Sequence, residues 1–557
     1  MLRSPFLSIV IGAAAALAAP AAMALDPPPS TTFIDQGWSK EIRELYYFTP
    51  QGSRTISYAW FMALETADGQ GMFADPAHLQ RFGFIPADGP HPLNPGGLPI
   101  GLALDPRAAP GSGPDLGLTC AACHTANVTV EGRRIRIDGG PANLDFDRFY
   151  ADLAAAVTRT FFDPGMFERF AARVLPSPSP TAAAELRLQF AEFQARIAGE
   201  AIIRRPTLAA GFGRVDAMTQ IVNALAVLDQ ADPHNVRAVN APTSYPSLWL
   251  APQLEFVQWT PIAANPIARN AGEVLGVFGN ATLTGDQQGW FASSILLTQL
   301  HAVESWLGDL KPPRWDEVLF GPIDRTLAAT GEGLYRLHCI GCHNAPPYRR
   351  TDPAANFFGK TFIEIGRVDY RAVGTDPNYM DSFLQRLVRT NPATIGPNGG
   401  KAVLPAAAYL LGTTAAILGR SMDEAGLSDA EKAALAGFRL RPPATPGGQP
   451  QLYEPPSVSD LKASPLAGVW ASGPYFHNGS VATVYEVLSS VEERRAVFWT
   501  GGRELDRTRL GFVSEDAPGR FRFDTSLLGN RRTGHLYPPQ GLTHDERMAI
   551  IEYLKTL

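Results

Sequence analysis

The stretch Cys339-Ile340-Gly341-Cys342-His343 places two cysteines two residues apart, with a histidine directly after the second. This spacing predicts covalent attachment of haem, in which the thiols add to the porphyrin and the adjacent imidazole binds iron. Cys120-Ala121-Ala122-Cys123-His124 repeats the pattern, and the two motifs use all 4 cysteines of the chain. A zinc site or a pair of redox dithiols is the alternative interpretation. We predict two covalently bound haem c groups. The predicted attachment sites and proximal iron ligands are Cys120, Cys123, Cys339, Cys342, His124 and His343.

Length and composition are those of a globular protein. The 557 residues suffice for two or three domains, and 45% hydrophobic and 18% charged residues are ordinary fractions. A formal net charge of -6 gives no reason to expect nucleic acid as a partner.

The N-terminus has the pattern of an export signal. An apolar, alanine-rich run follows Arg3 and ends in Ala22-Met23-Ala24, which fits the small-x-small rule for signal peptidase. We predict a signal peptide over residues 1–24, cleavage after Ala24, and a periplasmic or secreted protein without stable membrane insertion. An uncleaved membrane anchor is the alternative, although the run is short for a bilayer span.

The predicted fold is mainly α, with two cytochrome c-like haem domains, long loops and an N-terminal extension. The 48 prolines and 52 glycines predict long irregular connections between helices. The predicted boundaries are 25–110 for the extension or cap, 111–310 for the first haem domain and 325–557 for the second.

Local patterns predict individual elements. Residues 128–137 alternate as a β-hairpin with Glu131-Gly132 at the turn. Asn265 and Pro266 mark the N-cap and first residue of a helix. Capping boxes begin at Ser428 and Thr543, and the final helix is expected to cross the helix that carries Gly331 and Tyr335. Further helices are predicted within 45–64 and over 144–158, 182–198, 214–228 and 287–307.

The last hundred residues carry a family resemblance. Pro474-Tyr475-Phe476-His477-Asn478-Gly479-Ser480, together with the two haem motifs, resembles the bacterial di-haem cytochrome c peroxidase superfamily. Segments 461–488, 498–504 and 529–536 resemble its rubber oxygenase and fatty-acid dioxygenase branch. The resemblance implies one six-coordinate haem that stores electrons and one haem with an open face where the oxidant binds.

The resemblance also suggests which haem is saturated. The pair Gly534-His535 matches a pattern shortly before the final helix and implies His535 as the sixth ligand of the His343 haem. His477 and Met380 are the alternatives, and the resemblance implies a haem propionate contact for His477. No histidine follows His124 until His234, although His78 or His91 could fold over the first haem. We therefore expect the His124 haem to be open and catalytic.

Two further residues are predicted to take part in chemistry. Trp259 is the expected electron relay, with Trp249 as its competitor. Glu273 is the expected base for moving a proton between the peroxide oxygens. The alternative for Glu273 is a surface ion pair with Arg269, four residues earlier on the same helix. Val274 and Phe278 are candidates for an apolar wall over the iron.

These observations lead to three hypotheses about function. The first is a peroxidase that reduces hydrogen peroxide at the His124 haem, with electrons from the His343 haem and from a small cytochrome c or cupredoxin. The second is a dioxygenase that acts on an apolar unsaturated hydrocarbon or fatty acid. The third is a non-catalytic di-haem electron carrier. A bound calcium ion is compatible with each.

Overall fold

The computed structural model describes residues 31–107, 113–177, 179–264, 266–435, 439–453 and 457–557. The predicted signal peptide, 1–24, and the predicted N-cap Asn265 lie outside the described residues. Within the described ranges, no helix is both long and apolar enough to cross a membrane.

The prediction of a mainly α fold is wrong. The chain is 39% helical and 15% strand, and the strands form several small sheets. Two sheets have three strands, in the orders β1-β6-β5 and β2-β4-β3, and the others have two. The connections are long, and their buried backbone groups need hydrogen-bond partners, which short strand pairs supply. The strands of the three-stranded sheets are β1 (Thr31–Phe33), β2 (Ile56–Ser57), β3 (Leu102–Asp105), β4 (Asp115–Leu118), β5 (Thr125–Val130) and β6 (Arg133–Asp138).

The predicted hairpin is confirmed and slightly longer than expected. β5 and β6 pair antiparallel from Thr125↔Asp138 to Val130↔Arg133. Glu131 and Gly132 form the turn with φ of 50° and 76°, the left-handed pair that a tight hairpin favours. β1 joins β6 in parallel, so the first described residues lie on this sheet.

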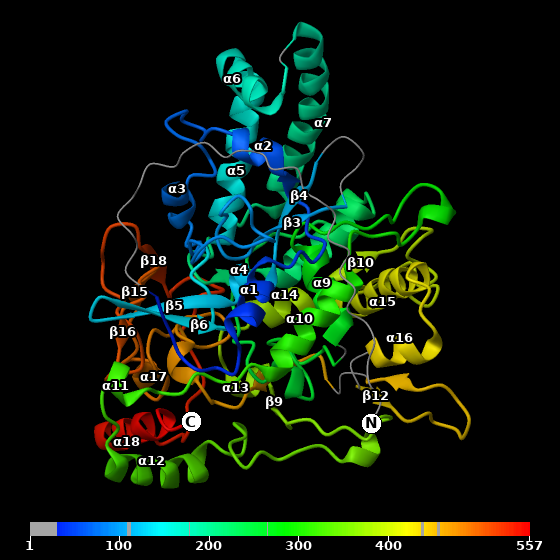
Figure 1. Cartoon of the computed structure of the whole chain (residues 1–557). Coiled ribbons are helices and arrows are strands. Elements are labelled where there is room, and N and C mark those ends of the chain that lie inside the picture. The colour runs from blue at the N-terminus through cyan, green and yellow to red at the C-terminus, as the bar shows by residue number, and fades with distance from the viewer. Residues whose placement is uncertain (1–30, 108–112, 178, 265, 436–438, 454–456) are drawn as a thin grey trace.

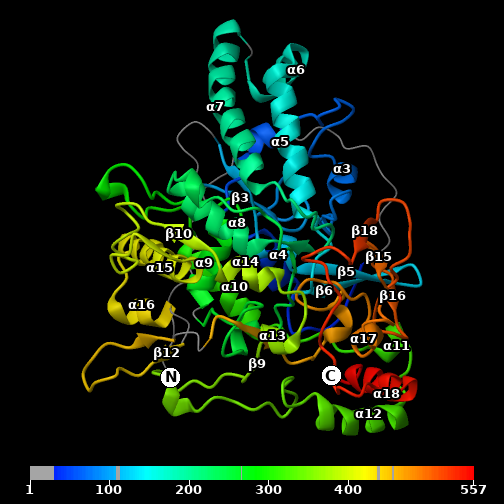
Figure 2. The ribbon, with the colours of Figure 1, turned by 180° about the vertical axis from the view of Figure 1, so that it is seen from behind.

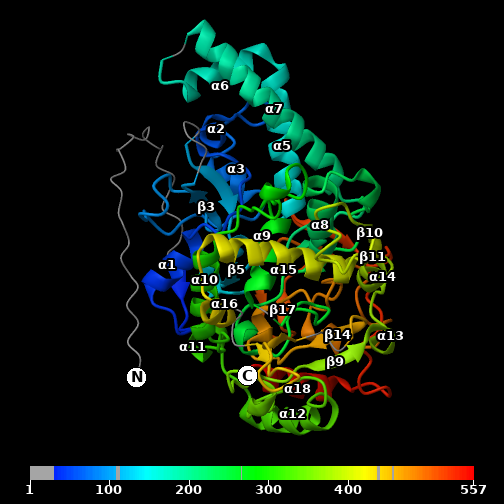
Figure 3. The same cartoon turned by 90° about the vertical axis from the view of Figure 1, so that its right-hand side faces the viewer.

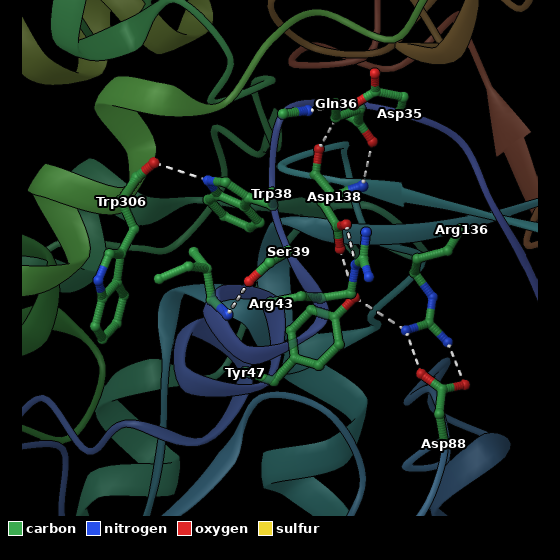
Figure 4. Close-up of polar contacts among 12 residues, drawn as sticks. Asp35, Gln36, Trp38, Ser39, Arg43, Tyr47, Asp88, Arg136, Asp138 and Trp306 are labelled. Atoms are coloured by element: carbon green, nitrogen blue, oxygen red, sulfur yellow. Dashed lines mark hydrogen bonds and ion pairs between the residues drawn. The ribbon is translucent and has the colours of Figure 1, made fainter.

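The N-terminal segment is fixed to β6 by a buried polar cluster (Figure 4). Asp138 accepts hydrogen bonds from the Tyr47 hydroxyl and from Arg43 Nε, the latter at 2.6 Å. Arg136 donates to the Tyr47 hydroxyl at 3.1 Å and forms an ion pair with Asp88 at 2.9 Å. Because Arg43, Tyr47, Arg136 and Asp138 are buried and mutually paired, they hold the segment in one register on the sheet.

Two helices occur within the predicted range 45–64, and the first lies against the Cys120 motif. α1 (Lys40–Phe48) begins at the N-cap Ser39, and α2 (Tyr58–Ala63) follows β2. The Tyr46 hydroxyl of α1 donates to the main-chain oxygen of His124 at 3.3 Å. α4 (Cys120–Cys123) is a single turn capped by Thr119.

Three helices form an arm that rises from one end of the molecule (Figure 1, Figure 2). They are α5 (Phe146–Phe162), α6 (Pro164–Val174) and α7 (Pro180–Arg204). The predicted helices over 144–158 and 182–198 correspond to α5 and α7, and both extend further. The prediction over 214–228 is correct in part, since α8 (Ala217–Asn223) continues as a π-helical segment, η1 (Ala224–Asp229).

The helix predicted over 287–307 is shorter than expected. Only Gln287–Gly289 forms a 3-10 turn, and α10 (Leu297–Asp309) begins eight residues later. Phe291 lies between them with φ of 67°, a left-handed conformation that interrupts a helix. α9 (Pro266–Gly276) begins at Pro266 as predicted and packs beside α10 and α15 (Ala406–Glu424) (Figure 3).

The opposite end of the molecule is closed by two crossing helices, α12 (Arg325–His338) and α18 (His544–Leu554) (Figure 1). A Cβ on Gly331 would lie 1.9 Å from the Ala549 carbonyl oxygen, so only glycine permits this approach. Tyr335 packs on Tyr553 with ring centroids 5.1 Å apart. The predicted crossing is therefore confirmed.

Both predicted capping boxes are also confirmed. Thr543 and Glu546 exchange hydrogen bonds at the start of α18. Ser428 and Glu431 exchange them at the start of α16 (Asp429–Leu435).

The remaining named elements connect these units. They are α3 (Pro76–Gln80), β7 (Arg214–Val215), β8 (Thr243–Ser244), α11 (Glu317–Phe320), β9 (Gly366–Asp369), α13 (Tyr370–Val373), α14 (Asn378–Leu384), β10 (Leu387–Arg389), β11 (Val403–Pro405), β12 (Leu440–Arg441), β13 (Gln451–Leu452), β14 (Asp460–Ala463), α17 (Val484–Val487), β15 (Val497–Thr500), β16 (Leu505–Asp506), β17 (Gly511–Phe512) and β18 (Phe521–Asp524).

Candidate haem-binding site

A cavity of about 470 Å³ is lined by both Cys-x-x-Cys-His motifs. The fold thus brings residues 120–124 and 339–343 to one internal space, although they lie far apart in the sequence. Further predicted site residues reach the same cavity. They are Trp259, Glu273, His477 and His535.

Each motif histidine is oriented by one main-chain carbonyl. His124 Nδ1 bonds to the Pro246 oxygen and His343 Nδ1 to the Ser464 oxygen, both at 2.8 Å. A carbonyl accepts only from N–H, so these contacts assign the proton to Nδ1 and leave Nε2 as the nitrogen able to bind a metal. Burial lowers the pKa of His343, and that of His124 to about 4, so both rings are neutral.

None of the four cysteines forms a disulfide. Burial raises the pKa of Cys120 and Cys123 to about 12 and that of Cys339 to about 11. Each motif therefore presents two cysteine side chains and a neutral imidazole to a largely apolar space, which fits haem c. A closed zinc site needs four ligands, and no group of three or more His, Cys, Asp or Glu able to hold a metal ion is found among the described residues.

His535 faces His343 across the cavity. Their ring centroids are 6.1 Å apart, and the ring planes are inclined by 55°. The His535 amide donates to the Val373 oxygen at 2.8 Å, and the preceding Gly534 has φ of 74°. A Cβ on Gly534 would lie 2.2 Å from the Gly374 carbonyl carbon. This close backbone approach accounts for the glycine and fixes the position of the histidine.

The two alternative sixth ligands have different surroundings. His477 lines the cavity and packs against Tyr379, with ring centroids 5.8 Å apart. Its Nε2 is buried and has no hydrogen-bond partner among the described residues. Met380 is fully buried in an apolar cluster with Tyr379 and Phe383 and does not line the cavity. The structure therefore brings His477, and not Met380, to the cavity.

Both tryptophans considered as relays reach the cavity. The Trp259 indole donates to the Ser244 oxygen at 2.9 Å, and the Trp249 indole donates to the Ala467 oxygen at 2.8 Å. The two indole rings are therefore held by hydrogen bonds to different main-chain oxygens.

Glu273 is held by a neighbour that sequence analysis did not identify. Its carboxylate accepts a hydrogen bond from Gln258 Nε2 at 2.6 Å. Arg269 pairs instead with Glu304, so the proposed surface pair between Arg269 and Glu273 is wrong. Burial raises the pKa of Glu273. Glu273 and Cys120 line the same cavity, and the charge of Glu273 adds to the effect of burial in raising the pKa of the Cys120 thiol.

His78 and His91, which were considered as residues that could fold over the first haem, make contacts outside the cavity. His78 lies 3.3 Å from a carboxylate oxygen of Asp152, and His91 stacks on Phe48 at 5.6 Å. Neither residue lines the cavity.

The predicted apolar wall is correct for only one of its two residues. Val274 lines the cavity, whereas Phe278 does not and instead packs on Tyr150 and on Phe146, which itself lines the cavity. Val277 lines the cavity in addition to Val274.

Several polar cavity residues could not be identified from the sequence, and Gln51, Gln258 and Lys462 are among them. Gln51 Oε1 accepts from the Cys120 amide at 3.2 Å. No local motif marks these residues, because each reaches the cavity only through contacts between distant segments.

Comparisons with known proteins agree with this site. Residues 461–500 match a family model described as RoxA-like, cytochrome c-like, which supports haem c binding and a haem-dependent oxidoreductase. The uncharacterized protein y4iM of Sinorhizobium fredii (strain NBRC 101917 / NGR234) is 25% identical over 57% of this chain and 60% of its own length. The uncharacterized protein y4iJ of the same organism is 33% identical over 94% of this chain and 93% of its own. The chain therefore belongs to the family of y4iJ, and it contains a RoxA-like, cytochrome c-like segment.

Proposed function

We propose that the protein is an exported di-haem c-type oxidoreductase that reduces hydrogen peroxide at the His124 site. Electrons reach that site from the His343 site, which a small cytochrome c or cupredoxin reduces. A bound haem c supplies an iron that exchanges electrons and, where one face is open, binds the oxidant. The shared cavity and the RoxA-like segment support a haem-dependent oxidoreductase.

Glu273 is the observation that favours peroxide as the oxidant. Cleavage of the O–O bond requires a group that takes a proton from one peroxide oxygen and returns it to the other. The Glu273 carboxyl lines the same cavity as Cys120 and is oriented by the hydrogen bond from Gln258. Its raised pKa keeps proton uptake and release closer to neutral pH than for an exposed glutamate.

The geometry at His343 supports its role as the electron store. His535 faces His343 across the cavity, so an iron bound by both rings has no free position for peroxide. Trp259 lines the same space and is the proposed relay between the two sites.

The test is peroxide reduction by Glu273→Gln, measured as oxidation of a reduced small cytochrome. Loss of a general base lowers the rate by about 10²–10⁴-fold. Haem content and spectra should match those of the parent protein. Glu255→Gln is the matched control, because Glu255 is also half-buried with a raised pKa but does not line the cavity. Full activity in Glu273→Gln would contradict the proposed base.

Oxygenation of an unsaturated hydrocarbon or fatty acid is the second candidate. It is supported by the RoxA-like match and by the apolar side chains of Ile221, Val274 and Val277 in the cavity. Oxygen consumption with an unsaturated fatty acid, unchanged in Glu273→Gln, would favour this reaction over peroxide reduction. Two six-coordinate haems that react with neither oxidant would instead indicate an electron carrier.

A further inference from the structure

Lys462 occupies a central position in the cavity wall. It belongs to β14, and its amide donates to the Trp259 oxygen at 2.9 Å. Two residues later, the Ser464 oxygen accepts from His343 Nδ1. The Lys462 side chain lines the cavity that contains both haem motifs. One short strand thus places this cation beside the proposed relay and beside the residue that orients an iron ligand.

The Lys462 ammonium group has no countercharge within the part of the chain that the structure describes. Among the described residues, no ion pair or side-chain hydrogen bond is formed by Lys462. The nearby carboxylates have other partners, since Glu273 accepts from Gln258 and Glu304 pairs with Arg269. Arg269, the charged neighbour with the largest effect on Lys462, is a second cation.

The residue that pairs with Lys462 on the neighbouring strand supplies no countercharge either. Lys462 lies directly opposite Arg367 in the antiparallel register of β14 and β9. Removing a lysine from water carries a cost unless an anion compensates. Burial, with a contribution from Arg269, lowers the pKa of Lys462 to about 8, so the group is still mostly protonated at neutral pH.

We propose that Lys462 binds a carboxylate group inside the cavity. The carboxylate belongs either to a haem propionate or to an acidic lipid-like substrate, and the assignment rests on the proposed haem loading. A single ammonium with apolar neighbours such as Leu461 and Val368 suits one carboxylate. It supplies too few donors for a phosphate, which favours several converging N–H groups.

Protection of the amine in the unmodified protein provides the first test. The haem-loaded protein is treated with formaldehyde and a mild reductant, and dimethylated lysines are located by peptide mass spectrometry. Lys462 should be modified at least tenfold more slowly than Lys401, which is exposed. If the His343 site carries haem and Lys462 still reacts as fast as Lys401, the proposal is wrong.

Two substitutions then distinguish the sources of the carboxylate. Lys462→Met removes the charge and Lys462→Arg retains it, while Lys401→Met is the surface control. Each variant is examined for haem content, for the midpoint potentials of its haems, and for absorption changes on addition of oleate or methyl oleate.

A propionate partner predicts a lower midpoint potential in Lys462→Met, because loss of a nearby positive charge favours ferric iron. Lys462→Arg should restore the potential, and the oleate response should not change. A substrate partner predicts unchanged potentials, at least tenfold weaker oleate binding in Lys462→Met, and an unchanged response to methyl oleate.

Unchanged potentials together with unchanged oleate binding in Lys462→Met would overturn the proposal. Failure of Lys462→Met to fold leaves the labelling experiment and Lys462→Arg as tests. Absence of haem from the parent protein would refute the proposed function first. Peroxide reduction that persists in Glu273→Gln would refute the peroxidase mechanism without affecting the result for Lys462.

Discussion

The imidazole rings of His343 and His535 face each other with centroids 6.1 Å apart. Two imidazoles that bind one metal ion from opposite sides, at about 2 Å each, have ring centres roughly 6 Å apart. The two histidines come from segments separated by most of the C-terminal third of the chain, yet their spacing suits one iron between them. Several measurable consequences depend on this and on other contacts described above.

Replacement of His535 by alanine should open the His343 site. Loss of the second imidazole leaves a five-coordinate or water-bound iron, so we expect one haem to change from low-spin to high-spin. Electron paramagnetic resonance and absorption spectra measure the change. His477→Ala is the control, because His477 lines the cavity but has no ring contact with His343 in the structure. If the low-spin haem signal is lost in His477→Ala and kept in His535→Ala, the sixth ligand is His477 and not His535.

Replacement of Trp259 by phenylalanine should slow electron transfer between the two haem sites. We expect a decrease of roughly tenfold, equivalent to about 1.4 kcal/mol in activation free energy. Stopped-flow oxidation of the prereduced protein by peroxide measures the rate. Trp249→Phe is the matched comparison, since both indoles line the cavity and each donates to one main-chain oxygen. A larger effect of Trp249→Phe would identify that residue as the relay.

Replacement of Gly331 by alanine should destabilise the crossing of α12 and α18. The new methyl group would lie 1.9 Å from the Ala549 oxygen, so the helices have to separate, at a cost of about 1–3 kcal/mol. Denaturant unfolding monitored by circular dichroism measures the loss. Gly333 lies on the same helix, and a Cβ added there would have no neighbouring atom within 4 Å, so Gly333→Ala should raise stability by about 0.5–1 kcal/mol. Equal effects of the two substitutions would argue against close contact at Gly331.

Asp147 should make stability depend on pH. Burial and the neighbouring Asp145 raise the pKa of Asp147 to about 7, while the unfolded chain has the ordinary value of 3.8. Between these values the folded protein binds more protons, so stability falls as pH rises from about 4 to about 7. Asp147→Asn should remove much of this decline and stabilise the protein at pH 8 by a few kcal/mol.

Unfolding midpoints measured from pH 4.5 to pH 8 test the prediction for Asp147. Glu168→Gln on α6 is the control, because Glu168 is exposed and should leave the pH dependence unchanged. The same decline with pH in Asp147→Asn would show that other groups cause it.

Structure that is encoded by neighbouring residues could be predicted from the sequence. The Glu131-Gly132 hairpin, the capping boxes at Ser428 and Thr543, and the start of α9 at Pro266 each depend on residues a few positions apart. Turn and cap residues act through their own backbone, so their effect can be predicted without knowledge of the rest of the fold.

The parts that sequence analysis missed depend on contacts between distant segments. β9 pairs with β14 across nearly a hundred residues, and neither strand is long enough to show a clear alternating pattern. The same is true of side-chain partners, because Arg269 forms its ion pair with Glu304 on another helix rather than with Glu273 on its own. Two-residue and four-residue strands, and buried ion pairs, are selected by packing and not by local propensity.

The N-terminal segment, residues 31–51, contacts the Cys120 motif through Tyr46 and Gln51, and this contact has a consequence for biogenesis. Residues 31–51 leave the ribosome before the segments that they contact, because β1 has no partner until β6 is made and Gln51 cannot contact Cys120 before that cysteine is present. Closing such long loops is slow compared with forming local helices. Enzymes that attach haem need access to both thiols and the histidine. For the proposed exported di-haem protein, we expect this delay to leave the Cys120 motif open to haem attachment, with docking of the N-terminal segment following as a late step of maturation.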